Sequence, residues 1–394
     1  MDGVSISHMC VLSDDYPDDN RMTFVFVQQL VDAMVDDGVL ISVVAPQSLT
    51  HSLLRGVRLL PKYQIYQTRQ GNSYAVYRPY SVSFGNGNKS LYRLVKRFNQ
   101  KQVNKCLNAI SPSIVYGHFW HNAMMATEYA SQKEIPLFVA CGEGDNALDD
   151  WAARLSNEEK IRIRHLVNGV ISVSTENKRK CLEYGLSTEL NTIVLPNCVN
   201  DEVFHPLDGT AFRNKLGASK SDFVISFTGA FIDRKGYNRL AEAIEILDDD
   251  CIKVIFSGKP MNGYKKNIPH CKGTIHCGAV NHNELPIYLC ASDVFVLPTL
   301  KEGCCNAIVE ALACGIPVIS SDRSFNDDIL NENNSLRVDP MNVSEISMAI
   351  KRLKDDGELF RHLKQYTLEH SSNYSIVVRA KRVRKFIESN LSKV

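Results

Sequence analysis

The sequence comprises 394 residues, of which 44% are hydrophobic and 23% are charged, and its formal net charge is +1. This length suits two domains that each bury a core, and the balanced charge excludes any whole-protein argument for a nucleic-acid partner. The N-terminus has no basic segment followed by a long apolar run, so we expect no secretory signal, and no stretch is apolar enough to cross a bilayer. Most of the twelve cysteines lie in apolar patterns, where cysteine behaves as a small hydrophobic residue. We therefore expect a protein of the reducing cytoplasm.

In the first half of the chain, short runs rich in valine and isoleucine alternate with helical patterns. The segment 24–38 has apolar residues at helical spacing and ends at Gly38, and 65–80 resembles a hairpin or two short strands. Further strands are predicted at 5–12, 39–46, 113–119, 135–140, 169–174 and 192–197. Such alternation predicts parallel strands joined by right-handed crossovers in a doubly wound sheet.

A polar stretch without periodicity, residues 197–212, interrupts this pattern and is interpreted as an interdomain linker. The pattern then restarts, with strands predicted at 223–229, 252–258, 274–278, 294–299 and 317–322 and helices at 237–247 and 283–292. We therefore predict an α/β protein with two Rossmann-like domains: 1–200 on the acceptor side, onto which a C-terminal helix of 373–394 packs back, and 201–372. A ligand is expected in a cleft between them, at the carboxyl ends of both sheets.

The stretch LPTLKEGCCNAIVEALACGIPV, residues 297–318, places Glu302 in a loop beyond a strand and Glu310 two turns inside a predicted helix. That helix should begin near 304–306 and stop at Gly315, and its first N–H groups make a phosphate site. Carboxylates repel a diphosphate but accept hydrogen bonds from vicinal hydroxyls. A nucleotide sugar fits this layout, with Glu302 on the sugar, the helix start on the diphosphate and Glu310 on the ribose. The alternative is a solvated helix face with two chance glutamates.

Small residues surround the predicted helix start. Gly303 lets a ligand approach the backbone, and the adjacent Cys304 and Cys305 are interpreted as small side chains beside the ligand, with Asn306 following them at the start of the helix.

The stretch ASDVFVLPTLKEGCCNAIVEALACGIPVISSD resembles the donor-binding signature of retaining GT-B glycosyltransferases of family 4, the glycosyl transferases group 1. Other similar stretches follow the family's order: ISVSTENKRKCLEYG, TIVLPNCVNDEVFHP, FTGAFIDRKGYNRLAEAI and TIHCGAVNHNELPIYL. The resemblance is dense from about residue 169 to residue 340 and looser before it. It implies the GT-B fold, with two Rossmann-like doubly wound domains facing across a cleft.

The resemblance also implies roles for residues of the second domain. Lys235 matches the family lysine that meets the donor diphosphate, and Gly258 resembles the glycine that lets the backbone approach the donor. Gly229, the glycine of the first strand of this domain, is also assigned to donor binding, and Val280 lies in the turn near the base. The family's arginine after Gly229 is replaced by Ala230 here, and Arg234 is interpreted as a substitute source of that charge. The alternative for Arg234 and Lys235 is a solvated turn.

In the first domain, IVYGHFWHNAMMA resembles the family strand whose histidine lies near the reacting sugar, which maps to His118, with His121 interpreted as structural. The stretch ACGEGD departs from the family pattern and leaves the roles of Glu143 and Asp145 open. The family's double-glycine loop is absent from SDDYPDDNRMTF, which puts the phosphate or acceptor contacts there in doubt.

No metal and no cofactor are expected. The His-Cys repeat at 270–277 fits no common zinc spacing, and the run 248–250 is interpreted as a solvated connection rather than a D-x-D metal site.

The resemblance implies a metal-independent retaining glycosyltransferase (EC 2.4 class) that moves a sugar from a nucleotide diphosphate sugar to a hydroxyl of a glycan or lipid-linked acceptor, in bacterial surface polysaccharide or glycolipid synthesis. His118, Glu302 and Lys235 would act by positioning and electrostatics. Two alternatives stay open: a GT-B sugar-nucleotide epimerase, and a non-catalytic nucleotide-sugar-binding subunit.

The basic segment 89–107 carries six Lys or Arg residues and no acid, and its apolar residues share one helical side. It is interpreted either as a helix packed on the sheet with a solvated basic face or as a peripheral contact with the inner face of the cell membrane.

Overall fold

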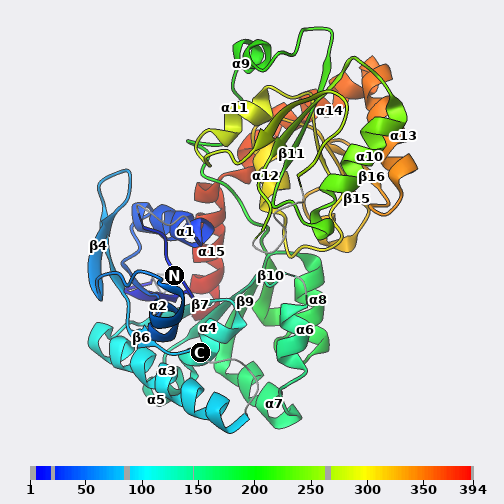
Figure 1. Cartoon of the computed structure of the whole chain (residues 1–394). Helices are drawn as coiled ribbons and strands as arrows, with labels where there is room; N and C mark the ends of the chain where they lie inside the picture. The colour runs from blue at the N-terminus through cyan, green and yellow to red at the C-terminus, as the bar shows by residue number, and fades with distance from the viewer. Residues whose placement is uncertain (1–5, 19–22, 84–88, 145, 262–267, 392–394) are drawn as a thin grey trace. The chain divides into compact units, whose positions relative to one another are not determined.

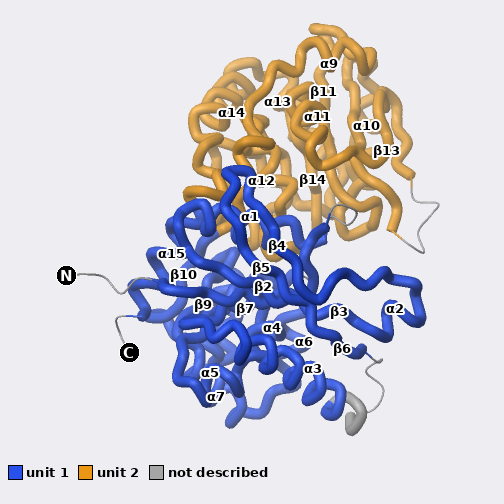
Figure 2. The backbone as a smooth tube through the Cα atoms, turned by 90° about the vertical axis from the view of Figure 1, so that its left-hand side faces the viewer, with its two compact units in different colours: residues 1–195, 379–394 blue, residues 196–378 orange. Residues whose placement is uncertain are grey.

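The computed structural model describes the whole chain except residues 1–5, 19–22, 84–88, 145, 262–267 and 392–394 (Figure 1). It divides into two units, which are coloured separately in Figure 2: unit 1 contains residues 1–195 and 379–394, and unit 2 contains residues 196–378.

Unit 1 is built on an eight-stranded sheet with the order β10-β9-β8-β7-β1-β2-β5-β4, in which every neighbouring pair is parallel except the β4–β5 hairpin. Its strands, with the additional two-stranded β3–β6 ribbon, are β1 Met9–Leu12, β2 Ile41–Val44, β3 Gln47–Ser48, β4 Tyr63–Gln67, β5 Ser73–Tyr77, β6 Tyr80–Ser81, β7 Ile114–His118, β8 Leu137–Cys141, β9 Val167–Ser172 and β10 Thr192–Val194. Strands β1, β2, β7 and β8 are buried at every position, as expected for parallel strands covered on both faces.

Most strands of unit 1 are followed in the sequence by one or more helices. They are α1 Val25–Asp36, α2 Leu49–Arg55, α3 Lys89–Ile110, α4 Trp120–Met125, α5 Thr127–Lys133, α6 Ala147–Ala152, α7 Asn157–Leu166 and α8 Thr175–Glu183, with a 3-10 turn η1 Glu189–Asn191. Ser156 begins α7 with a capping box and Ser174 caps α8, so the chain has polar signals at these helix starts.

The last helix, α15 Ile376–Leu391, returns the chain to unit 1, where it is drawn in red in Figure 1. Ala380, Val383 and Ile387 of α15 are buried, and the ring of Phe386 contacts that of Phe138 in β8. A Cβ atom on Gly169 of β9 would come within 2.8 Å of both rings, so a glycine is needed where the helix meets the sheet.

Unit 2 contains a six-stranded, all-parallel sheet with the order β13-β12-β11-β14-β15-β16. Its strands are β11 Phe223–Thr228, β12 Ile252–Ser257, β13 Thr274–Gly278, β14 Val294–Leu297, β15 Val318–Ser321 and β16 Ser335–Val338. Its helices are α9 Thr210–Lys215, α10 Tyr237–Leu247, α11 Leu285–Cys290, α12 Asn306–Ala313, α13 Val343–Asp355 and α14 Gly357–Glu369, with 3-10 turns η2 Asp233–Lys235, η3 Ser324–Asn326 and η4 Ser371–Tyr374.

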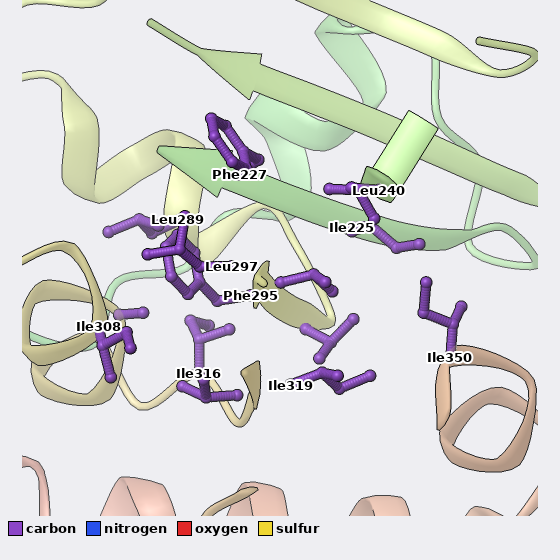
Figure 3. Packing of buried hydrophobic residues seen from close by; sticks show 14 of the residues in the cluster. Ile225, Phe227, Leu240, Leu289, Phe295, Leu297, Ile308, Ile316, Ile319 and Ile350 are labelled. Carbon is purple, nitrogen blue, oxygen red and sulfur yellow. The ribbon is translucent and has the colours of Figure 1, made fainter. Parts of the chain in front are cut away.

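The core of unit 2 holds the central strands against helices of both layers (Figure 3). Phe227 of β11, Phe295 of β14, Ile308 of α12 and Ile350 of α13 are completely buried. Each such side chain stabilises the fold by about 1.5–3 kcal/mol relative to leaving it in water. This packing fixes the carboxyl ends of β11 and β14, from which the loops of the site emerge.

The α/β fold with parallel, doubly wound sheets is confirmed. Strand β16 and the short β3–β6 ribbon were not predicted. Strands β3 and β6 have two residues each, too few to show any period, and β16 contains Ser335 and Arg337, so it lacks the apolar run by which the other strands were recognised.

Candidate functional site

Two glycines bring the ends of β11 and β12 into backbone contact in unit 2. The amide of Gly229 donates to the carbonyl of Ser257 at 3.0 Å, and a Cβ atom on Gly258 would lie 1.9 Å from the carbonyl oxygen of Gly229. Only glycine fits at position 258. The resemblance implied that Gly258 lets a ligand approach the backbone, and in the structure the missing side chain also allows the backbones of Gly229 and Gly258 to contact each other.

The turn η2 is tied to the end of β14 through a buried arginine. Arg239 of α10 is 5% exposed; it donates to Asp233 Oδ1 at 3.1 Å and to the carbonyl of Pro298 at 3.0 Å. Gly236 has φ of +75°, and a Cβ atom there would lie 2.3 Å from the same carbonyl. The loops after β11 and β14 are therefore held together before any ligand binds. The sequence analysis did not identify Asp233 or Arg239. Arg239 is 59 residues from Pro298 along the chain, and no sequence pattern predicts a contact between positions so far apart.

Glu302 lies between the two basic residues of η2. Its Oε1 is 2.7 Å from Lys235 Nζ and 2.9 Å from Arg234 Nη1, and it also accepts a hydrogen bond from Thr299 Oγ1 at 2.8 Å. The side chains are 12% exposed for Glu302, 16% for Lys235 and 32% for Arg234, so all three are largely buried but still reach the surface. Two cations face one carboxylate, which leaves the cluster with one excess positive charge. The sequence predicted all three residues as site residues but did not predict that they pair.

The ionisation of Lys235 is controlled by its neighbours. Burial alone would lower its pKa, but the Glu302 carboxylate beside it acts in the opposite direction and the pKa of Lys235 lies above its ordinary value, so Lys235 stays an ammonium. Cys305 is 1% exposed, and burial raises its pKa to about 11, so it stays a neutral thiol. This residue therefore has the properties of a small apolar side chain rather than of a nucleophile.

Helix α12 begins immediately after this cluster. Cys305 is its N-cap residue, it provides no side-chain cap, and Asn306 is the first helical residue. The helix ends at Ala313, and Gly315 follows in the left-handed region with φ of +72°. Both ends agree with the sequence prediction.

Glu310 faces the interior from the second turn of α12. The residue is 9% exposed, and burial raises the pKa of its carboxyl to about 8, while the charge of Lys235 acts in the opposite direction. Among the described residues, this carboxyl has no hydrogen-bond partner. Burying a carboxyl group without a hydrogen-bond partner costs free energy, and a ligand that donates hydrogen bonds to it would offset that cost.

The remaining predicted residues of unit 2 line the same neighbourhood less directly. Gly303 is buried in the bend before α12, while Cys304, in the same bend, and Val280, in the loop after β13, are partly buried and pack on the core of unit 2. Asn306 accepts a hydrogen bond from Asn197 at 2.9 Å through its side-chain oxygen.

His118 belongs to unit 1, at the end of β7. It is 6% exposed, and burial, together with the charges of Arg379 and His121, lowers its pKa to about 3, so the imidazole is neutral. Its ring lies 5.2 Å from that of Phe26 and 4.7 Å from that of Phe119. Within the described residues its Nδ1 is buried without a hydrogen-bond partner.

The described residues contain no group of three or more His, Cys, Asp or Glu side chains arranged to hold a metal ion. The aspartates at 248–250 instead pair with lysines: Lys272 contacts Asp248 and Asp250, and Lys354 contacts Asp249.

Comparison with known proteins identifies a family segment in unit 2. Residues 208–370 match the family model described as glycosyl transferases group 1. A curated relative from Escherichia coli, the UDP-Gal:alpha-D-GlcNAc-diphosphoundecaprenol alpha-1,3-galactosyltransferase, is 27% identical over 228 residues, which are 55% of this chain and 58% of the relative. The chain spans between 36% and 63% of the length of three such curated relatives.

Solved structures of similar fold extend over the whole chain. The sucrose-phosphate synthase from Thermosynechococcus elongatus superposes with a TM-score of 0.75 at 15% identity and covers 98% of this chain and 100% of that one. Anabaena HepE in complex with UDP-glucose superposes with a TM-score of 0.70 at 14% identity and covers 97% and 99%. At such low identity these matches show the fold, which is GT-B, as the sequence predicted.

Proposed function

We propose that this chain, whose residues 208–370 match the glycosyl transferases group 1, is a retaining glycosyltransferase that moves a sugar from a nucleotide diphosphate sugar to a hydroxyl acceptor. The observation that carries the proposal is the arrangement of Lys235, Arg234 and Glu302 beside the start of α12, with the buried carboxyl of Glu310 in the second turn of that helix.

Each part of this arrangement matches one part of a nucleotide sugar. The excess positive charge of the Lys235–Arg234–Glu302 cluster and the start of α12 attract a diphosphate. Glu310 would accept hydrogen bonds from the ribose hydroxyls, which supplies the donors that its buried carboxyl lacks. Lys235, Arg234 and Thr299 all contact Oε1 of Glu302, so Oε2 is the oxygen through which it would bind the transferred sugar.

In the reaction the departing nucleotide diphosphate takes up negative charge. Lys235 stabilises that charge, and Glu302 has a double role, because it orients Lys235 and Arg234 as well as the sugar. We assign no protein nucleophile: the leaving diphosphate itself accepts the proton of the incoming hydroxyl on the same face of the sugar. Neutral His118 of unit 1 would help to position the reacting sugar, and no metal is required in this scheme.

The acceptor class is proposed from the relatives. The E. coli relative is named for a diphosphoundecaprenol-linked acceptor, and we propose a glycan or lipid-linked acceptor of the same kind for this chain, in bacterial surface polysaccharide or glycolipid synthesis. The protein would then act in the cytoplasm or at the inner face of the cell membrane.

A membrane contact through α3 and α2 is part of this proposal. None of the helices in the described residues is long and apolar enough to span a bilayer. In α3, Val103 and Leu107 are buried, as the packed-helix alternative predicts, but Leu94 is 63% exposed and Phe98 is 40% exposed. The side chain of Leu91 lies outside the described side chains.

Helix α2 also has two exposed leucines. Leu53 and Leu54 are 84% and 79% exposed, and both α2 and α3 contact the short strand β6. In α3, the exposed Leu94 and Phe98 flank Lys96 and Arg97, and such a combination of apolar and basic side chains binds anionic lipid surfaces. Co-sedimentation with anionic vesicles at low salt tests this contact; absence of binding, or binding that survives reversal of the Lys96 and Arg97 charges to Glu, would disprove it.

The catalytic proposal is tested by donor binding and turnover. A panel of UDP-, GDP-, ADP- and dTDP-sugars is screened by thermal shift, because a ligand that binds the folded state raises the Tm. The sugar nucleotide that binds is then incubated with the protein, alone and with a bacterial lipid extract. Transfer to the extract supports the proposal, whereas conversion to a new sugar nucleotide without acceptor indicates an epimerase. Binding without any turnover indicates a non-catalytic subunit.

A further inference from the structure

We propose that β4 is a contact surface for a second copy of this chain, so that two copies of unit 1 join through their β4 strands in a homodimer. The two strands run antiparallel across the contact, with Ile65 of one copy opposite Ile65 of the other. The inference goes beyond the proposed transferase function and does not depend on it.

Strand β4 is the outermost strand at one end of the sheet of unit 1 (Figure 1), where it pairs with β5. The ladder shows which of its backbone groups face outward. The amide of Arg78 donates to the carbonyl of Lys62 at 2.8 Å, and the amide of Thr68 donates to the carbonyl of Asn72 at 2.8 Å. Because bonded and non-bonded positions alternate along an antiparallel pair, the N–H and C=O groups of residues 63, 65 and 67 point away from β5.

The side chains at these outward positions are exposed and uncharged. Tyr63 is 53% exposed, Ile65 is 50% exposed, and Gln67 is also exposed. The residues from 63 to 68 include no Lys, Arg, Asp or Glu. The edge of β4 therefore combines free backbone groups with half-exposed apolar side chains, which is the combination that pairs with another strand.

The other outermost strands of the two large sheets each carry a feature that blocks such pairing. Strand β10 has three residues and is followed closely by Pro196. Strand β13 has a register shift in its pairing with β12, and β16 carries Arg337, which forms ion pairs with Asp322 and Asp327. Short length, proline, irregular register and charge are the usual protections of a sheet edge. Residues 63–67 of β4 have no proline, charge or register shift.

A second β4 strand fits this edge position by position. With Ile65 opposite Ile65, Tyr63 of each copy lies opposite Gln67 of the other, and Gln64 lies opposite Tyr66. The three outward N–H groups and three outward C=O groups of each copy then bond to those of its partner, which makes six hydrogen bonds and leaves no outward group of residues 63, 65 and 67 unpaired. The exposed Tyr63 and Ile65 of both copies meet on one face of the joined sheets.

The flanking cations agree with the same register. Lys62 falls opposite Thr68 of the other copy, and Arg69 falls opposite Pro61, so no cation directly faces another. Lys62 and Arg69 also lie on opposite faces of the strand, because side chains alternate along it. A surface that is complementary to itself about one residue favours a closed two-fold dimer. For this reason we assign the edge to a second copy rather than to an unrelated strand.

The first experiment measures the mass of the full-length protein in solution. A contact made by one strand lies at the small end of specific interfaces, so sedimentation velocity from about 1 to 100 µM should show a reversible change from the chain mass of 44.2 kDa to twice that mass. Ile65→Lys places two ammonium groups opposite each other and should weaken the dimer by about tenfold or more. Leu190→Lys makes the same change at a side chain that is 85% exposed in η1 and should dimerise like the wild type.

A mixing experiment tests the register and shows that the variants are folded. Ile65→Lys and Ile65→Asp should each be mainly monomeric alone, whereas an equimolar mixture should form a dimer, because opposite charges then face each other across the axis. Unfolded variants could not recover dimerisation in this way. A wild type that stays monomeric up to about 100 µM overturns the inference. A dimer that Ile65→Lys does not weaken, or a mixture that stays monomeric, also overturns it.

Discussion

The buried carboxyl of Glu310 predicts a specific dependence of stability on pH. Burial raises its pKa from the ordinary value of 4.5 to about 8, so between these values the folded protein holds a proton that the unfolded chain releases. The free energy of unfolding therefore falls as pH rises through this window, since the folded state binds more protons than the unfolded state. Glu310→Gln removes the titrating group while it keeps the shape of the side chain.

The size of the effect follows from these two values. Between about pH 5.5 and 8.5 the wild type should lose about 3 kcal/mol relative to Glu310→Gln, at 1.36 kcal/mol for each unit of pKa difference. For a unit the size of unit 2, 1 kcal/mol changes Tm by about 2–4 °C, so the Tm of the wild type should fall by about 6–12 °C relative to that of the variant.

Scanning calorimetry of both proteins at the two pH values measures this difference. Trp120 and Trp151 both lie in unit 1, so tryptophan fluorescence follows that unit separately and should show no such change. Glu242→Gln, an exposed carboxyl on α10 of unit 2, is the matched control and should behave like the wild type. A difference between wild type and Glu310→Gln that stays constant across this pH range would refute the reasoning.

Three further predictions concern the same unit. Lys235→Met should weaken the affinity for a nucleoside diphosphate, measured by calorimetry, by about tenfold or more, since a charge-assisted contact contributes about 1.5–3 kcal/mol; an affinity as high as that of the Lys272→Met control would contradict it. Glu302→Gln should retain or tighten nucleoside diphosphate binding, because a negative charge beside Lys235 and Arg234 is removed, while donor turnover falls; equal losses of binding in Glu302→Gln and Lys235→Met would disprove this division of roles. Gly258→Ala should destabilise unit 2 by more than about 2 kcal/mol in thermal unfolding, because its Cβ would lie 1.9 Å from a carbonyl oxygen, whereas Gly357→Ala, which meets open space, should change stability little; equal Tm values for the two variants would count against the tight backbone contact.

Local patterns predicted most of the fold. The strands of both sheets except β16, the β4–β5 hairpin and the bounds of α12 followed from short apolar runs that alternate with helical patterns and from terminators such as Gly315. These features depend on residues close together in the sequence, which is why they can be predicted without coordinates. The candidate site residues of unit 2 came from the motif and its resemblance, and the structure brings Lys235, Glu302 and the start of α12 together.

The contacts between loops could not be predicted in this way. Glu302 pairs with Arg234 and Lys235 across more than sixty residues of sequence, and Arg239 reaches Pro298 over a similar distance. The positive φ angles of Phe24 and Phe119 also have no signal in the sequence, because the usual signal for such a conformation is glycine or asparagine. Long-range pairing and backbone strain are properties of the assembled sheets rather than of any segment.

The return of α15 to unit 1 has a consequence for the order in which the protein is synthesised. Arg384 of α15 pairs with Asp37, and Arg379 donates to the carbonyl of Leu195, so the helix closes contacts with segments translated much earlier. While residues 196–378 leave the ribosome, α15 does not yet cover the sheet of unit 1, and Phe138 lacks the ring of Phe386 that it contacts in the folded protein. Domains usually complete their folding from the N-terminus onward during synthesis. In this chain unit 2 can finish first, and nascent unit 1 must keep an apolar face in solution until the last helix emerges.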